Sequence, residues 1–120
     1  MSDCIFCKII NGEIPCKKIY EDDEMLAFND IRPMAPVHLL VIPKKHIASL
    51  LHLEAEDAAL IGRLMYKAQE LAKEPGIGGP KGCGEKGARF VINAGKNAGQ
   101  TVDHIHIHVL GGRKLLWPPG

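Results

Sequence analysis

The sequence predicts an α+β fold in which a mainly antiparallel sheet packs against one long helix. Three short apolar segments bounded by turn residues precede a single amphipathic run, and two more such segments follow it. Strands, then one helix, then strands is an order typical of an antiparallel sheet with a helix on one face. The chain has 120 residues, about the size of one domain, so we expect a single domain over residues 1–120.

The first part of the chain predicts a short helix followed by three strands. Residues 4–11 are apolar on one side, which favours one or two helical turns. Residues 17–21 and 24–29 are two strand candidates separated by an acidic turn, as in a hairpin. After a loop with two prolines, residues 37–42 form the most apolar strand candidate of this region, and Pro43 ends it.

Residues 53–74 predict the long helix. Apolar side chains recur there at intervals of three and four, namely at Leu60, Ile61, Leu64, Met65, Ala68, Leu71 and Ala72. Acidic residues near the start and Lys73 near the end suit the helix dipole. Residues 76–87 are rich in glycine and predict a mobile connector. Two further strands are expected over residues 88–93 and 103–110.

Composition excludes several classes of function. Lys plus Arg is 15 and Asp plus Glu is 14, so the net charge of +1 gives no attraction to nucleic acid or to an anionic membrane. No apolar run approaches the ~20 residues of a membrane helix. The N-terminus has no basic segment followed by an apolar core, as a secretory signal would. We therefore expect a cytoplasmic protein with reduced cysteines that binds neither nucleic acid nor a membrane.

The most informative segment is residues 104–109, where histidines alternate with aliphatic residues: His104, Ile105, His106, Ile107, His108 and Val109. On a strand, this alternation places the three imidazoles on one face and the aliphatic side chains on the other, beneath the helix. Neighbouring rings would then start roughly 6.6–6.8 Å apart, close enough for two of them to converge on one phosphate or one metal ion.

Three interpretations of this segment compete: a solvent-facing strand that happens to carry histidines, a tri-histidine metal site, and a catalytic site. The loop over residues 93–101 favours catalysis. Its glycines expose backbone N–H groups, and its amide and hydroxyl side chains suit an anionic oxygen. A plain structural metal has no evident use for such a loop.

The histidine segment and its surroundings resemble the histidine triad family, specifically its branch of nucleotide-binding proteins that act as nucleoside phosphoramidate hydrolases. Matching motifs occur in order along nearly the whole chain, over residues 5–10, 13–15, 27–31, 36–47, 99–101, 104–113 and 117–120. The resemblance implies a five-stranded antiparallel sheet with one long helix and a short N-terminal helix. It also implies a purine nucleoside monophosphate or phosphoramidate as ligand.

Within this resemblance, His106 is the nucleophile, which attacks the α-phosphorus and forms a nucleotidyl-imidazole that water resolves. His108 would hold phosphate oxygens and help protonate the departing amine, and His38 would support the histidine segment. The implied nucleotide contacts, besides His106 and His108, are Phe6, Ile9, Phe28 and Ile31 at the purine, Asp30 at the ribose, and Asn93, Gly99, Gln100 and Thr101 at the phosphate and ribose. Ordinary core packing remains the alternative for the four apolar residues, and a structural role for His38.

Cys4 and Cys7 form a C-x-x-C pair, which supplies two of the four ligands that a closed zinc site needs. The resemblance implies that His46 and His104 complete a structural zinc site. Two buried thiols beside an exposed His46, or a redox pair, are the alternatives.

The resemblance further implies a two-fold homodimer in which Trp117 approaches the partner's site.

The sequence leaves two other functions open. The first is a dinucleoside polyphosphate hydrolase that uses the same histidine on a larger substrate. The second is a nucleotide-binding or zinc-stabilised adaptor whose partner protein carries the biological role.

Overall fold

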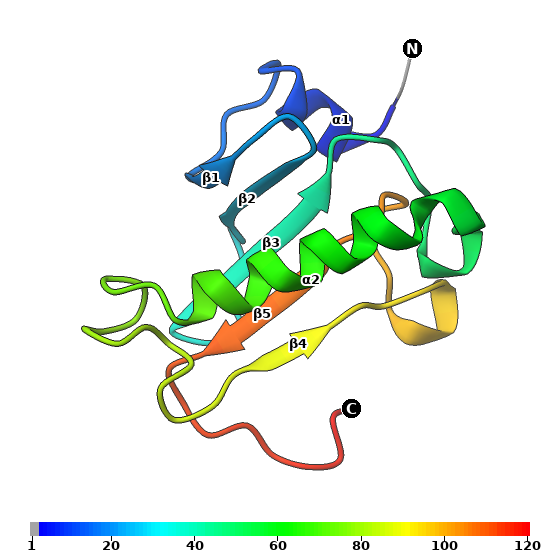
Figure 1. Ribbon diagram of the computed structural model, residues 1–120. Helices are drawn as coiled ribbons and strands as arrows, with labels where there is room; N and C mark the ends of the chain where they lie inside the picture. Colours follow the sequence, from blue (N-terminus) through cyan, green and yellow to red (C-terminus); the bar gives the residue numbers. More distant parts are fainter. Residues whose placement is uncertain (1–2) are drawn as a thin grey trace.

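The computed structural model describes residues 3–120 and contains a five-stranded antiparallel sheet of strand order β1-β2-β3-β5-β4 (Figure 1). The strands are β1 (Lys18–Glu21), β2 (Met25–Asn29), β3 (Val37–Pro43), β4 (Arg89–Val91) and β5 (Ile107–Gly111). The α-helices are α1 (Ile5–Ile10) and α2 (Ala58–Ala72), and short 3-10 turns cover Leu50–His52, Ala55–Asp57 and Lys96–Ala98. This architecture confirms the predicted fold class. Within residues 3–120, neither α-helix is both long and apolar enough to cross a membrane.

The two helices pack on opposite faces of the sheet. Both faces can bury apolar side chains because successive strand residues point to opposite sides. Figure 1 shows α2 lying across the face formed by β3 and β5. On that face Leu64 and Ala68 of α2 share a core with Ile107 and Val109 of β5. On the other face Phe6 of α1 joins a second core with residues of β2 and β3. Since Ile107 and Val109 face α2, His108 between them points to the side of α1.

Helix α1 is held by a side-chain cap at its N-terminus and by one buried residue. The Cys4 sulfur caps the helix by accepting from the backbone N–H of Cys7 at 3.3 Å, and Phe6 is the buried residue of the helix. A helix of six residues is too short to be stable by itself in water. Its position therefore depends on what Phe6 and the two cysteines contact.

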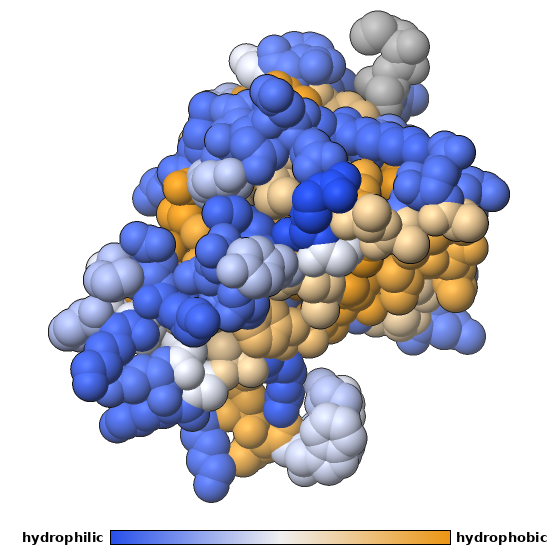
Figure 2. All heavy atoms as spheres, in the orientation of Figure 1, coloured by the Kyte–Doolittle hydropathy of each residue, from blue (hydrophilic) through white to orange (hydrophobic). Residues whose placement is uncertain are grey.

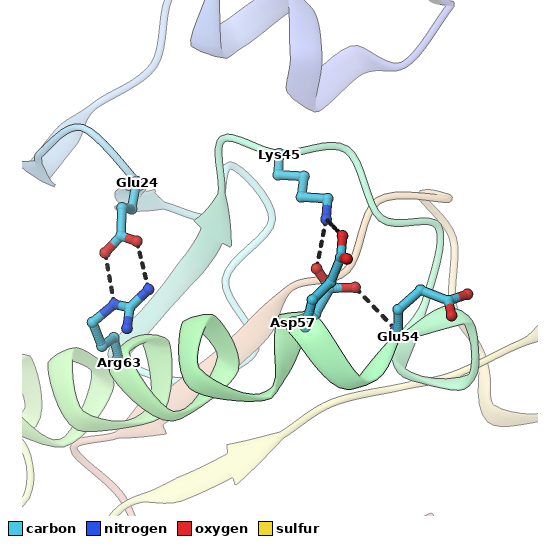
Figure 3. Close-up of polar contacts among 6 residues, drawn as sticks. Glu24, Lys45, Glu54, Asp57 and Arg63 are labelled. Carbon is cyan, nitrogen blue, oxygen red and sulfur yellow. Dashed lines mark hydrogen bonds and ion pairs between the residues drawn. The ribbon is translucent and has the colours of Figure 1, made fainter.

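The loop after β3 is tied to the start of α2. Lys45 Nζ lies 2.6 Å from Asp57 Oδ1, and Asp57 Oδ2 accepts from the backbone N–H of Glu54 at 3.0 Å (Figure 3). The Lys45 ammonium and the Glu54 N–H together hold the pKa of the Asp57 carboxyl below its ordinary value. The helix was expected from residue 53, but its first turn is a 3-10 turn over Ala55–Asp57, so α2 begins at Ala58.

A bidentate pair anchors the middle of α2 to the turn between β1 and β2. Arg63 Nε and Nη2 donate to the two carboxylate oxygens of Glu24 at 2.7 and 2.6 Å (Figure 3). Both side chains are about half exposed, so the pair fixes the orientation of α2 more than it stabilises the fold.

The glycine-rich segment is packed against the sheet and α2, and the expectation of a mobile connector is wrong for residues 82–84. Gly84 N–H donates to the carbonyl of Ala72 at 2.7 Å, which caps α2, and Cys83 is buried beside Gly111. At Gly82 the φ angle is +79°, and a Cβ there would overlap the Ala72 carbonyl. These glycines permit a close backbone approach rather than motion.

Strand β5 is shorter than predicted, because it begins at Ile107 rather than at residue 103. The β3–β5 ladder stops at the pair Val41 and Ile107. The next residue of β3 on that side is Pro43, which has no N–H to donate, and its carbonyl instead accepts from the His104 ring at 2.8 Å. The backbone N–H of Ile105 turns away to the Ile47 carbonyl at 2.7 Å. Strand β4 is likewise shorter, covering Arg89–Val91 of the expected 88–93.

Candidate active site

A cavity of about 330 Å³ opens on the face of the sheet that carries α1. Its walls are mostly apolar, contributed by Phe6 and Ile9 of α1 and by Phe28 of β2. His106 and His108 also line it. Further polar groups come from Asp30, Arg32 and Thr101, among others. An apolar cleft with a few convergent polar groups is typical of a small-molecule site.

The imidazole of His106 presents an unprotonated nitrogen. Its Nδ1 lies 2.7 Å from the backbone carbonyl of His104. A carbonyl can only accept, so Nδ1 carries the proton and Nε2 of the neutral ring keeps its lone pair. The ring is buried, 4% exposed, and Phe6 packs edge-on against it with centroids 5.2 Å apart at 90°. These contacts fix both the orientation and the tautomer of His106.

His108 presents the complementary nitrogen, a donor. The backbone N–H of Met34 donates to His38 Nδ1 at 3.0 Å, so the proton of neutral His38 lies on Nε2. His38 Nε2 lies 2.9 Å from His108 Nδ1 and donates to it, which leaves the proton of His108 on Nε2. The rings of His106 and His108 are 4.9 Å apart. One lone pair and one N–H therefore lie side by side in the cavity.

Burial keeps these rings neutral. It lowers the pKa of His38 and of His106, against the opposing field of the Asp30 carboxylate. It lowers the pKa of His108 to about 4, and repulsion from His106 and His38 adds to the effect. A neutral imidazole at pH 7 is a nucleophile, whereas an imidazolium is not.

Asp30 faces this group from the end of β2. Its Oδ2 lies 3.4 Å from His38 Nε2, and its Oδ1 accepts from the backbone N–H of Arg32 at 2.8 Å. The facing atoms of Asp30, His38 and His108 lie within 4.8 Å of one another, as metal ligands would. The hydrogen bond between the two rings already uses their facing nitrogens, so we interpret this group as a proton network rather than a metal site.

A second cluster lies on the other side of Phe6 and contains two sulfurs and two imidazole nitrogens. The ligand atoms of Cys4, Cys7, His46 and His104 all lie within 4.8 Å of one another. Cys4 Sγ is 3.3 Å and His46 Nδ1 is 3.1 Å from His104 Nδ1. The fully buried His104 donates from Nε2 to the carbonyl of Pro43, so its Nδ1 carries the lone pair that faces the cluster. Two thiols and two imidazoles fit a tetrahedral zinc ion, and a carbonyl behind a ligating histidine is usual for such sites.

The ring of His104 faces a different site from the rings of His106 and His108, as the predicted zinc site requires, although Phe6 of α1 contacts both His104 and His106 on one face of the sheet. His104 and His106 precede β5, and the ring of His104 faces the cysteines, whereas His106 and His108 line the cavity. The physical reason is the end of the ladder at Pro43, which frees the backbone at residues 104–106 to turn.

Most residues expected at the nucleotide do line the cavity: Phe6, Ile9, Phe28, Asp30, Ile31, Thr101, His106 and His108. Asn93, Gly99 and Gln100 are not among its lining residues. The Gln100 amide donates to the carbonyls of Ala48 and Val102 at 2.7 and 2.9 Å and accepts from Gly95 N–H at 2.8 Å. These bonds make Gln100 a brace of the loop in this conformation.

Sequence reasoning missed other lining residues, among them Cys16, Leu40 and Val102. Leu40 is the cross-strand partner of His108. Only the register of β3 against β5 could have identified it, and no sequence motif marks Cys16 or Val102.

The fold and the paired histidines define a histidine triad type of protein. Consistently, the profile of the HIT domain family matches residues 11–115, and the chain belongs to that family. An uncharacterized HIT-like protein of Synechococcus elongatus is 52% identical over 118 residues, which cover 98% of this chain and 97% of the relative.

Solved structures agree with this assignment. A HIT family hydrolase from Legionella pneumophila superimposes with a TM-score of 0.90 at 47% identity, covering 98% of this chain and 100% of that one. A zinc-bound histidine triad family protein from Mycobacterium smegmatis gives a TM-score of 0.74 at 36% identity, covering 92% of this chain and 76% of that one. The chain therefore has the fold of HIT family hydrolases.

Proposed function

We propose that the protein hydrolyses purine nucleoside phosphoramidates through a covalent nucleotidyl-His106 intermediate. The observation that carries the proposal is the hydrogen bond from His106 Nδ1 to the His104 carbonyl, which leaves Nε2 unprotonated in a cavity beside an N–H of His108. The Legionella relative with the same fold is a hydrolase, which supports a hydrolytic outcome.

The substrate is held at three places. The purine lies between the apolar side chains of α1 and β2, with Phe6 and Phe28 as aromatic walls. The carboxylate of Asp30 accepts hydrogen bonds from the ribose hydroxyls. The phosphate lies against His106 and His108, where Thr101 supplies a hydroxyl. The loop braced by Gln100 contributes backbone N–H groups.

The reaction proceeds in two halves. A solvent proton on the phosphoramidate nitrogen makes that nitrogen a leaving group. His106 Nε2 attacks the α-phosphorus, the bond between phosphorus and nitrogen breaks, and the protonated nitrogen leaves as a neutral amine while the Nε2–H of His108 donates a hydrogen bond to the phosphate. Water then attacks the same phosphorus and releases one proton to solvent, and the bond to His106 breaks. Neutral His106, still protonated at Nδ1, is regenerated together with the nucleoside monophosphate.

Mass spectrometry of protein quenched during turnover of adenosine 5′-phosphoramidate tests the intermediate. We expect a nucleotidyl adduct on the peptide that contains His106, and none in His106→Asn. Faster turnover of diadenosine tetraphosphate than of the phosphoramidate would favour the alternative of a dinucleoside polyphosphate hydrolase. A chain that stays unmodified under conditions that slow the hydrolysis of the intermediate would contradict the covalent mechanism.

We also propose that Cys4, Cys7, His46 and His104 hold a structural zinc ion. The donor set supports it, and the Mycobacterium relative is described as zinc-bound. Zinc would supply folding stability there and takes no part in the bond-making steps assigned to His106. Metal analysis should give stoichiometric zinc, and Cys4→Ser should lose it.

A two-fold homodimer is the third part of the proposal. Strand β4 is an edge of the sheet, and Figure 2 shows apolar surface between α2 and β4. Exposed apolar side chains come from α2, β4 and the C-terminal tail: Met65, Phe90, Leu116 and Trp117. Pairing two such surfaces would cover this edge and bring Trp117 towards the partner's site. Sedimentation equilibrium should give twice the chain mass, and a monomer at all concentrations would contradict the proposal.

A further inference from the structure

Helix α1 lies between the cavity and the cysteine-histidine cluster. Ile5, Phe6 and Ile9 of α1 line the cavity, whereas Cys4 and Cys7 belong to the cluster. The helix and its N-cap residue Cys4 therefore contribute a wall to one site and half of the ligands to the other. Because six residues do not form a stable helix alone, the position of α1 depends on its contacts with the rest of the chain, and these two sets are among them.

Phe6 connects the two sites physically. Its ring contacts His104 of the cluster at a centroid distance of 5.8 Å and His106 of the cavity at 5.2 Å. It also packs edge-on against Phe28 at 5.6 Å, and it is 6% exposed. A displacement of α1 would move Phe6 away from all three rings and open the wall of the cavity.

The rest of the cluster is attached to the rigid part of the molecule. His104 is fully buried and hydrogen-bonded to the carbonyl of Pro43 in β3. His46 lies between Lys45, which is paired with Asp57 at the start of α2, and the buried Ile47. An ion shared by these two histidines and the two cysteines would therefore join α1 to the sheet and to the loop that α2 anchors.

We propose that metal occupancy of the Cys4-Cys7-His46-His104 cluster controls the affinity of the cavity for nucleotides, by holding α1 and Phe6 in place. The effect falls on binding rather than on the bond-making step, because the hydrogen bond that sets the tautomer of His106 is made to a backbone carbonyl. This inference rests on the proposed function, since it takes a purine nucleotide as the occupant of the cavity.

The first test compares zinc-loaded and chelator-treated protein by calorimetric titration with adenosine 5′-monophosphate. Loss of one well-placed aromatic wall predicts about tenfold weaker binding by the metal-free chain. Thermodynamic linkage requires the reverse effect to be equal in size. The zinc affinity measured with saturating adenosine should therefore rise by the same factor by which zinc raises the affinity for adenosine. Adenosine is used here because it carries no phosphate to chelate the metal.

The second test is hydrogen exchange of the backbone amides. Without metal, the amides of α1 should exchange faster, whereas those of β3 and α2 should keep their protection. His46→Ala, which retains three ligands, should weaken both zinc and nucleotide binding. His52→Ala is the matched control, because His52 is an exposed histidine whose ring contacts Ser49 outside the cluster, and it should change neither.

The outcomes separate the two proposals. Equal nucleotide affinity with and without zinc, or a chain that binds no zinc, would overturn the metal-dependent control and leave the nucleotide site standing. Failure of the zinc-loaded chain to bind adenosine 5′-monophosphate at all would overturn the proposed function itself. If chelation unfolds the whole chain, the comparison of His46→Ala with His52→Ala decides the question in folded protein.

Discussion

Acidification should destabilise the folded chain through the buried ring of His108. Burial, helped by repulsion from His106 and His38, lowers the pKa of His108 to about 4 in the folded protein, against an ordinary value of 6.5. Between these two pH values the unfolded chain binds a proton that the folded chain does not bind. The stability contributed by the neutral ring is therefore present above pH 6.5 and is lost as the pH falls towards 4.

The size of the effect follows from the same two pKa values. At about pH 5 the unfolded His108 is almost fully protonated and the folded one is largely neutral, which costs about 2 kcal/mol of unfolding free energy. This is a sizeable share of the roughly 5–15 kcal/mol that holds a typical domain together. His38 and His106 are shifted in the same direction, so the total loss should exceed that of His108 alone.

Urea unfolding at a series of pH values from about 7.5 to 5, with the same metal load in every sample, measures this loss. His108→Asn keeps a carbonyl that can accept from His38 Nε2 but removes the titrating ring. The unfolding free energy of this variant should fall less steeply as the pH is lowered, because its unfolding takes up about one proton fewer over this range. His52→Asn, which removes an exposed imidazole that does not line the cavity, is the control variant. Equal slopes for wild type and His108→Asn would refute the assignment of a neutral, buried His108.

Two further changes test other parts of the structure. Gly82→Ala should lower the unfolding free energy by more than about 2 kcal/mol in urea, because φ is +79° and its Cβ would overlap the Ala72 carbonyl. Gly79→Ala, at φ +141° with open space around it, should cost clearly less, and equal losses would contradict the packing argument. His38→Ala should lower the turnover of a phosphoramidate about 10–100-fold with little change in nucleotide affinity, because His108 loses the donor that sets its tautomer. Steady-state kinetics beside equilibrium binding separates the two effects, and an unchanged turnover would remove His38 from the network.

Patterns that depend on neighbouring residues could be predicted from the sequence. The stripe that includes Leu64 and Ala68 does face the sheet, and Ile107 and Val109 do pack beneath α2. Both patterns follow from the periods of helix and strand, which each element sets for itself. The same reasoning correctly placed His108 on the face opposite α2.

Features that depend on a distant partner could not be predicted in this way. The start of β5 is decided by Pro43, some sixty residues earlier in the chain, because a proline opposite the histidine segment ends the ladder. The close approach of Gly82 and Gly84 to Ala72 is likewise a tertiary contact, and their composition alone resembles a flexible loop. For the same reason an amide suited to phosphate, that of Gln100, is engaged by the carbonyl of Ala48.

The two-residue spacing of the histidines has a different physical use from the one that strand geometry suggests. His106 Nδ1 is bonded to the backbone carbonyl two residues earlier, and a backbone carbonyl is present whatever side chain residue 104 carries. The ring of His104 and the carbonyl of His104 therefore act separately, the ring at the metal cluster and the carbonyl on the nucleophile. His104→Ala should weaken zinc binding yet leave Nε2 of His106 unprotonated, which the nitrogen shifts of that ring in an NMR spectrum would report. If that variant instead changed the tautomer of His106, the ring and not the backbone would be what prepares the nucleophile.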